Sequence, residues 1–156
     1  MRERAIEIRQ ARRSEVAQIL ALLAEDSLLN PPEVGVAVAG HFAAFDAMAA
    51  DPNHELIVAT LDEDVVGTLQ LSFIPGLALS GAWLAQIEGV RVRKDLRNLR
   101  IGTRLMEWVI VKAKERECRL IQLTSNRSRV DARRFYSRLG FQASHVGMKL
   151  YLAGPK

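Results

Sequence analysis

Between an apolar segment at residues 86–92 and a long helical pattern stands the stretch Arg97-Asn98-Leu99-Arg100-Ile101-Gly102-Thr103-Arg104. The apolar segment, Gln86-Ile87-Glu88-Gly89-Val90-Arg91-Val92, has the composition of a strand, so a strand runs through a basic loop into a helix. The first amides of a helix have no partner within the helix, and the helix dipole is positive at that end. The sequence therefore predicts an anion site, of the kind that holds phosphate, where this helix begins.

The patterns on either side of this stretch predict one mixed α/β domain over residues 1–156. The strand patterns lie at residues 5–11, 55–60, 65–74, 82–92, 120–124 and 142–152. The helical patterns lie at residues 13–25, 36–50, 101–117 and 131–139, with Gly140 as the expected cap of the last helix. We therefore expect a central mixed sheet of about six strands flanked by four helices.

Two connections fix the expected topology. The strands at 55–60 and 65–74 flank the turn Leu61-Asp62-Glu63-Asp64, which predicts an antiparallel hairpin. The strands at 82–92 and 120–124 enclose the helix at 101–117 and should be parallel. That helix has one apolar face, formed by Ile101, Leu105, Trp108, Val109 and Ala113.

Composition narrows the class of protein. With 49% hydrophobic and 26% charged residues, the chain has the balance of a soluble globular protein, and it contains no apolar run long enough to span a membrane. The N-terminus lacks the apolar core of a signal peptide. Cys118 is the single cysteine, so no internal disulfide can form. These features predict a cytoplasmic protein without a membrane partner.

Basic residues gather in two clusters, although the net charge is only +4. The first holds Arg91, Arg93, Lys94, Arg97, Arg100 and Arg104, and the second holds Arg127, Arg129, Arg133, Arg134 and Arg138. Such clusters are usually solvated surface, but both flank a turn that leads into a helix, which favours a polyanionic ligand. They lack interleaved aromatic residues and the charge is modest, so nucleic acid is not the expected partner.

The loop, the element order and a downstream motif together resemble the GNAT superfamily, whose members transfer an acyl group from acyl-coenzyme A to an amine. The downstream motif is Asp131-Ala132-Arg133-Arg134-Phe135-Tyr136-Ser137-Arg138-Leu139-Gly140-Phe141. In the family's loop signature Arg97 takes the first position and Gly102 the last, but Arg100 replaces the middle glycine. A glycine there allows a positive φ or a close approach to phosphate, whereas an arginine could pair with the phosphate instead.

The resemblance implies acetyl-CoA as acyl donor and assigns residues to it. Val90, Arg91 and Val92 would hold the pantetheine through backbone groups. The pyrophosphate would lie on the loop and helix start, formed by Arg97, Asn98, Leu99, Arg100, Ile101, Gly102 and Thr103. The family often has an asparagine where this chain has Arg129, and nearby Asn126 is the candidate replacement. Arg133 completes the expected coenzyme-binding set.

The same resemblance implies two catalytic residues. Tyr136 matches a tyrosine that the family places beside the coenzyme sulfur, and a phenol with a pKa near ~10 can donate a proton at neutral pH. Glu88 lies on a strand from which several members take a general base. Strand alternation would put Glu88 on one face with Gln86 and Val90, and Arg91 on the other. The alternatives are a packed tyrosine and a solvated carboxylate that balances Arg91 or Arg93.

The expected function is N-acetyl transfer from acetyl-CoA to a primary amine of a small molecule, amino acid or protein. No metal is expected, since His41, His54 and His145 lack the spacing of a metal site. Arg100 and the missing asparagine leave an alternative, a non-catalytic module that senses acyl-CoA. The acceptor would contact residues 28–45 and 75–83, whose small apolar residues and low charge favour a small or partly apolar amine over a strongly anionic one. The strand at 142–152 or the hairpin could form a homodimer by edge pairing.

Overall fold

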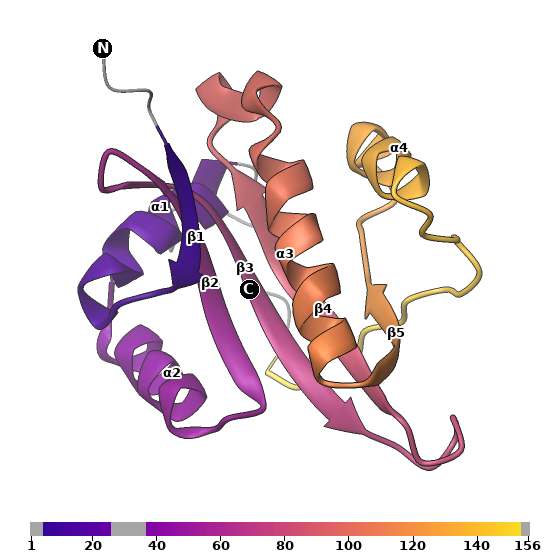
Figure 1. Cartoon of the computed structure of the whole chain (residues 1–156). Coiled ribbons are helices and arrows are strands. Elements are labelled where there is room, and N and C mark those ends of the chain that lie inside the picture. Colours follow the sequence, from indigo (N-terminus) through magenta and orange to yellow (C-terminus); the bar gives the residue numbers. More distant parts are fainter. Residues whose placement is uncertain (1–4, 26–36, 154–156) are drawn as a thin grey trace. The chain divides into compact units, whose positions relative to one another are not determined.

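The computed structural model describes residues 5–25 and 37–153, and Figure 1 shows their helices and strands. The chain forms two compact units, Met1–Gln122 and Leu123–Lys156, and each is described by itself. The expectation of a single domain over residues 1–156 stays a prediction. None of the described helices is long and apolar enough to cross a membrane.

The first unit is built on a five-stranded sheet in the order β1-β2-β3-β4-β5. The strands are β1 (Ile6–Gln10), β2 (His54–Leu61), β3 (Asp64–Pro75), β4 (Trp83–Val92) and β5 (Cys118–Leu123, whose last residue belongs to the second unit). The first four pair antiparallel, whereas β4 and β5 run in the same direction in Figure 1, as the sequence predicted. The predicted hairpin is confirmed, and Asp62 and Glu63 take positive φ in its turn, which matches the twist of the strands.

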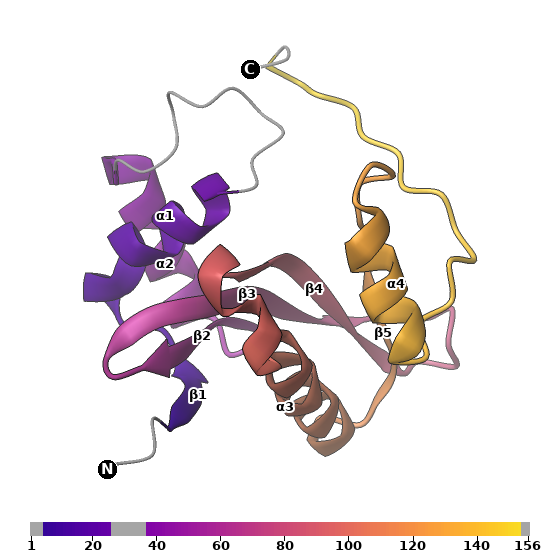
Figure 2. The same ribbon diagram turned by 90° about the horizontal axis from the view of Figure 1, so that it is seen from above.

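Helices cover both faces of this sheet, with α1 (Val16–Glu25) and α2 (Ala39–Ala50) on one side and α3 (Ile101–Glu115) on the other (Figure 2). Two short 3-10 helices, η1 (Arg13–Glu15) and η3 (Lys94–Leu99), precede α1 and α3. The helix α3 packs very close to β3, because a Cβ on Gly67 would lie 3.1 Å from Leu105 and 3.2 Å from Ile101. Met106 is fully buried in that interface, while the predicted core residue Trp108 is only half-buried.

The opposite face of the sheet packs against α1. Ile19 and Leu22 of α1 form a buried cluster with Val58 and Val65, which lie on β2 and β3. By contrast, α2 buries no residue completely; it is held at its side by Arg13, which pairs with Asp46 at 3.0 Å. The apolar core of the first unit therefore lies between α3 and the sheet and between α1 and the β2–β3 half.

The second unit contains α4 (Val130–Arg138), which Gly140 caps with a φ of +98°, as expected. The predicted strand at residues 142–152 is wrong, because this segment has no regular structure. Its apolar residues alternate, but the side chain of Met148 is 91% exposed. Alternation determines only which side chains share a face. A strand also needs a neighbouring strand with which its backbone N–H and C=O groups can form hydrogen bonds, and the described part of the second unit contains no complete strand.

A partly buried ion pair holds the chain in place at the start of α1. Arg9 donates to both carboxylate oxygens of Glu15, at 2.6 and 3.0 Å, and the backbone N–H of Arg12 donates to the same carboxylate at 2.7 Å. The hydrogen bond from Arg9 is the largest cause that lowers the pKa of Glu15 below its ordinary value. Glu15 is thus held as a carboxylate where the chain leaves β1 for α1.

We expect Glu15→Gln to lower the free energy of unfolding by about 2 kcal/mol at pH 7, since the charged acceptor of these bonds is lost. Because the pKa of Glu15 is lowered in the folded state, its contribution is present above the ordinary Glu pKa of ~4.3. It is lost as the pH falls through the folded-state pKa. Urea unfolding between pH 7 and pH 3.5 should show the two proteins converging below about pH 4.

Asp46→Asn is the matched control for this prediction. The Asp46 carboxylate pairs with Arg13, but both side chains are more than half exposed, so its loss should cost less than about 0.5 kcal/mol. A Glu15→Gln variant as stable as the Asp46→Asn variant at pH 7 would contradict the stabilising role of the Arg9–Glu15 pair.

Candidate functional site

A β-bulge interrupts β4 at the position that the sequence marks for coenzyme binding. Gln70 of β3 pairs with Glu88, and Thr68 pairs with Arg91, so Gly89 and Val90 together oppose one residue of β3. Gly89 has a φ of +63°, the left-handed conformation that glycine adopts without strain. The glycine in the strand pattern was the only sequence signal for this bulge.

The bulge corrects the expected alternation of β4. Directly paired residues of antiparallel strands project to one face, and Gln70 and Thr68 share a face of β3. Glu88 and Arg91 therefore lie on the same face of β4, not on opposite faces as simple alternation predicted. This is the face turned away from α3. Glu88 is exposed there, and Arg91 is half-buried.

Polar side chains lie around Glu88, and none of them is among the residues predicted from the sequence to form the site. Gln70 lies directly opposite Glu88, and Ser72 lies opposite Gln86. Gln122 of β5 donates to the Gln86 carboxamide at 2.6 Å, which joins the two parallel strands through their side chains. This half of the face thus presents hydrogen-bonding groups, whereas Leu71 and Ile87 on the α3 face are fully buried.

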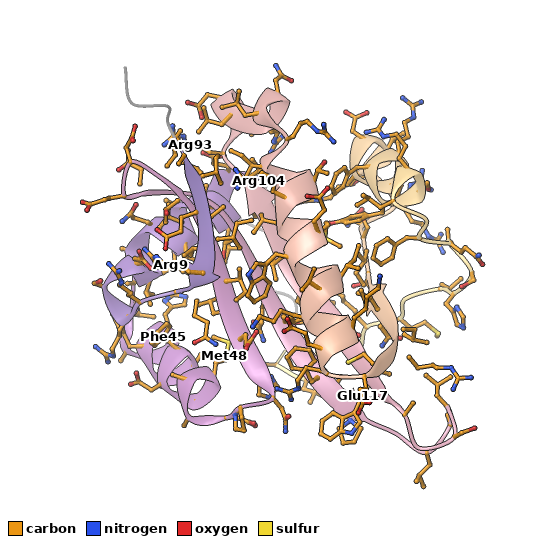
Figure 3. All side chains as sticks on the ribbon, in the orientation of Figure 1. Arg9, Phe45, Met48, Arg93, Arg104 and Glu117 are labelled. Atoms are coloured by element: carbon orange, nitrogen blue, oxygen red, sulfur yellow. The ribbon has the colours of Figure 1, made fainter. Side chains whose placement is uncertain are left out.

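The first basic cluster lies where β4 ends and α3 begins, and Figure 3 labels Arg93 and Arg104 at that end. Most of its side chains bind the protein itself: Arg93 pairs with Asp95 at 2.8 Å, and Arg104 donates to the Ile6 carbonyl at 3.0 Å. Arg97 donates through Nε to the Val92 carbonyl at 3.3 Å. Because these three side chains are engaged, the cluster contributes less available charge than its sequence implied. Within the described residues, the side chain of Arg100 makes no hydrogen bond or ion pair and keeps its charge available.

Arg100 sets the geometry of the loop. It takes φ +58° and ψ +25°, the left-handed conformation, and stands as the N-cap of α3. The helix makes its first hydrogen bond from the Arg104 N–H to the Arg100 carbonyl, so the amides of residues 101–103 precede the first intrahelical bond. Ile101 is fully buried and anchors this turn, while Asn98 and Leu99 of η3 are exposed. The helix start is thus suited to an anion.

Tyr136 lies in the second unit, on the apolar face of α4. Its ring packs edge-to-face against Phe135 at 5.2 Å and against Phe141 at 5.7 Å between centroids. Gly140 permits the second contact, because its positive φ lets the Phe141 N–H return to the Tyr136 carbonyl at 3.1 Å. The motif around Tyr136 is therefore a built aromatic cluster whose geometry depends on the helix cap.

The other two predicted coenzyme residues also lie in the second unit. The Asn126 Oδ1 accepts from the backbone and the hydroxyl of Ser128, at 3.0 and 2.8 Å, so it closes its own loop. Arg133 is exposed and lines an open hollow of about 470 Å³ with Val130, Arg134, Ser137 and Arg138. The predicted residues thus fall into two groups: Glu88, residues 90–92 and residues 97–103 in the first unit, and Asn126, Arg133 and Tyr136 in the second.

The remaining reactive side chains have local roles. The Nδ1 atom of His41 accepts a hydrogen bond from the backbone N–H of Val38 and so caps α2. The Nδ1 atom of His54 forms a hydrogen bond of 2.9 Å with the hydroxyl of Ser72. Burial raises the pKa of the Cys118 thiol, which disfavours the nucleophilic thiolate. No three His, Cys, Asp or Glu side chains of the described part gather as metal ligands would. Part of the expected acceptor segment, residues 28–36, lies outside the described residues.

Residues 18–141 match the model of the "Acetyltransferase (GNAT) family". The chain is 33% identical over 101 residues to an aminoalkylphosphonate N-acetyltransferase of Salmonella typhimurium, a match that covers 65% of each chain. A solved structure described as a transcriptional regulator from Bacillus halodurans is 42% identical, has a TM-score of 0.89, and is matched over 95% of this chain and 100% of its own. Glucosamine-6-phosphate N-acetyltransferase from Arabidopsis thaliana shares the fold, with a TM-score of 0.81 at 18% identity. The match covers 95% of this chain and 99% of the Arabidopsis chain.

We expect Gly89→Ala to lower the free energy of unfolding by about 1 kcal/mol, because the residue must keep a positive φ. Steric conflict adds little, since the new Cβ would lie 3.6 Å from the Leu23 side chain. Gly40→Ala, on α2 with open space around it, is the control and should be neutral or stabilise by up to about 0.5 kcal/mol. Equal stability of the Gly89→Ala protein and the wild type in urea would contradict the bulge.

Proposed function

The chain belongs to the GNAT acetyltransferase family, and we propose that it transfers an acetyl group from acetyl-CoA to the primary amine of an acceptor. The observation that carries the proposal is the combination of the bulge in β4 with the left-handed residue that opens α3. The first interrupts the backbone pairing of a strand, and the second leaves helix amides available to an anion. A thioester ligand that carries a pyrophosphate could form backbone hydrogen bonds at the bulge and place its pyrophosphate at the start of the helix.

The described residues fit acetyl-CoA by their donor set. Val90, Arg91 and Val92 offer backbone groups at and after the bulge, and Ile101, Gly102 and Thr103 offer amides at the positive end of α3. Arg97, Asn98, Leu99 and Arg100 form the loop before the helix, and the Arg100 guanidinium would pair with a phosphate. For Asn126 and Arg133, which lie in the second unit, a role in coenzyme binding rests on the family resemblance alone. Acetyl-CoA supplies the acetyl group as a thioester.

Two side chains would handle the protons. The acceptor amine attacks only when neutral, while an aliphatic amine with a pKa of ~10.4 is charged at pH 7. Glu88, exposed beside the bulge, would accept that proton directly or through water. Tyr136 would donate a proton to the departing thiolate, and its aromatic neighbours hold the ring in place. Both roles follow from the family resemblance and from the position of each residue in its unit.

The relatives point to the acceptors worth testing. The name of the Salmonella typhimurium relative states that it acts on aminoalkylphosphonates. The hydrogen-bonding groups around Glu88 also support a polar acceptor over the small or partly apolar one that residues 28–45 and 75–83 favoured. A panel of small polar amines, with 2-aminoethylphosphonate among them, is therefore the first to assay.

Two observations favour a second candidate, a module that binds acyl-CoA without catalysis. Arg100 occupies a left-handed position at which the family signature has glycine, and the 42% identical structure is described as a transcriptional regulator. Binding of acetyl-CoA with no transfer to any amine of the panel would favour this candidate.

Activity of single variants tests the catalytic assignment. In a thiol-release assay, Tyr136→Phe should lower kcat by about 100-fold, because the proton donor is lost, with little change in acetyl-CoA affinity. Glu88→Gln should lower kcat/KM at pH 7 and recover part of it at pH 9, where more of the acceptor is neutral. Wild-type turnover in the Tyr136→Phe protein would remove the acid role.

Substitution of Arg100 separates its side chain from its backbone conformation. Arg100→Gly should raise the free energy of unfolding by about 0.5–1 kcal/mol, because glycine relieves the left-handed strain. Arg100→Ala keeps that strain and loses the guanidinium, so its acetyl-CoA affinity should fall about tenfold. Calorimetry of both variants measures these effects, and undiminished affinity in Arg100→Ala would show that the guanidinium makes no phosphate contact.

A further inference from the structure

We propose that the Arg91 side chain selects the acceptor, and that the preferred acceptor carries an oxyanion, a carboxylate or phosphonate, on the same short chain as its amine. The inference rests on the proposed acetyl transfer and adds the residue that would determine its specificity. It starts from the bulge, which turns Arg91 onto the face that bears Glu88.

Glu88 and Arg91 are the only charged residues on this face of β3 and β4. Their neighbours on the face are uncharged, namely Thr68, Gln70, Ser72 and Ile74 of β3 and Leu84 and Gln86 of β4. Thr68 is buried and donates its hydroxyl to the Ile57 carbonyl at 2.9 Å, so its polar group serves the sheet. A ligand on this face would therefore meet one negative and one positive group, the complement of an amine that also carries an anion.

The spacing of the two groups limits the size of the acceptor. Their partners on β3, Gln70 and Thr68, are two residues apart, which corresponds to about 7 Å along a strand. A chain of two or three carbon atoms between the amine and the anion spans this distance once both side chains turn toward the ligand. A longer diamine or a peptide amine would place no anion at Arg91.

The position of the guanidinium suits this role. Arg91 donates through Nη1 to the Val90 carbonyl at 2.8 Å, which holds the group beside the bulge. A guanidinium has five N–H donors in a planar fork, so bonds within the protein are compatible with a further bond to an oxyanion. Arg91 is half-buried, and partial exclusion of water strengthens a charge-assisted hydrogen bond.

The test compares three amines of similar length and basicity: 3-aminopropylphosphonate, 4-aminobutanoate and n-butylamine. With the wild-type protein and acetyl-CoA, we expect kcat/KM to be about 10- to 100-fold higher for the anionic amines than for n-butylamine. The ratio between the phosphonate and the carboxylate then identifies which oxyanion the site prefers.

Substitutions assign the preference to one side chain. Arg91→Met should bring the anionic-to-neutral ratio close to 1, and Arg91→Lys, which keeps the charge without the fork, should retain part of it. Arg119→Met removes an exposed arginine of β5 and should keep the wild-type ratio. Acetyl-CoA titration and urea unfolding of each variant show whether it remains folded and binds the donor.

The outcomes separate this inference from the proposed function. Equal kcat/KM for the three amines in the wild type, or an equal loss on all three in Arg91→Met, would overturn the role of Arg91 and leave acetyl transfer intact. Acetylation of none of the amines by a protein that binds acetyl-CoA would count against the proposed transfer itself. A ratio lost in Arg91→Met and kept in Arg119→Met would support the inference.

Discussion

The φ of +63° at Gly89 is the backbone constraint from which the candidate site follows. It accommodates one extra residue in β4, and that residue shifts the register between β3 and the end of β4. Glu88 and Arg91 then share a face, and Val92 pairs with Gly67 on the face that packs against α3. A side chain at position 89 would have to take the same strained conformation, so the arrangement depends on glycine.

The two faces of the sheet have different roles: the face covered by α3 contributes to stability, and the opposite face carries the candidate site. Leu71 and Ile87 lie on the face that α3 covers, and Leu105 and Met106 of α3 are fully buried as well. Each such buried side chain contributes about 1.5–3 kcal/mol. On the other face α1 packs against β3 and reaches the bulge of β4, where a Cβ on Gly89 would lie 3.6 Å from the Leu23 side chain. Beyond that contact, the strip that bears Glu88 and Gln86 presents polar groups. Rigid packing under the strip keeps its side chains in register, which a site that aligns an amine requires.

Local patterns in the sequence were sufficient for most elements of the first unit. The hairpin turn and the amphipathic α3 rest on neighbours a few residues apart, and both were confirmed. The same holds for the Gly140 cap of α4 in the second unit. The prediction of a strand at residues 142–152 was wrong because a strand needs a pairing partner, which the alternation of side chains cannot specify. The predicted orientation of Arg91 was wrong because a bulge is defined by the pairing of two strands. It becomes visible only in the register between β4 and β3. The contacts that occupy Arg93, Arg97 and Arg104 likewise come from tertiary structure, so sequence overstated the charge available to a ligand.

The central claim is that β4 after its bulge and the start of α3 form an acyl-coenzyme A site although Arg100 replaces a glycine. Isothermal titration of the purified chain with acetyl-CoA, with desulfo-coenzyme A as a second ligand, tests this most directly. We expect saturable binding of one coenzyme per chain with a Kd in the micromolar range, which corresponds to a binding free energy of about −8 kcal/mol. No heat of binding at millimolar coenzyme would contradict it.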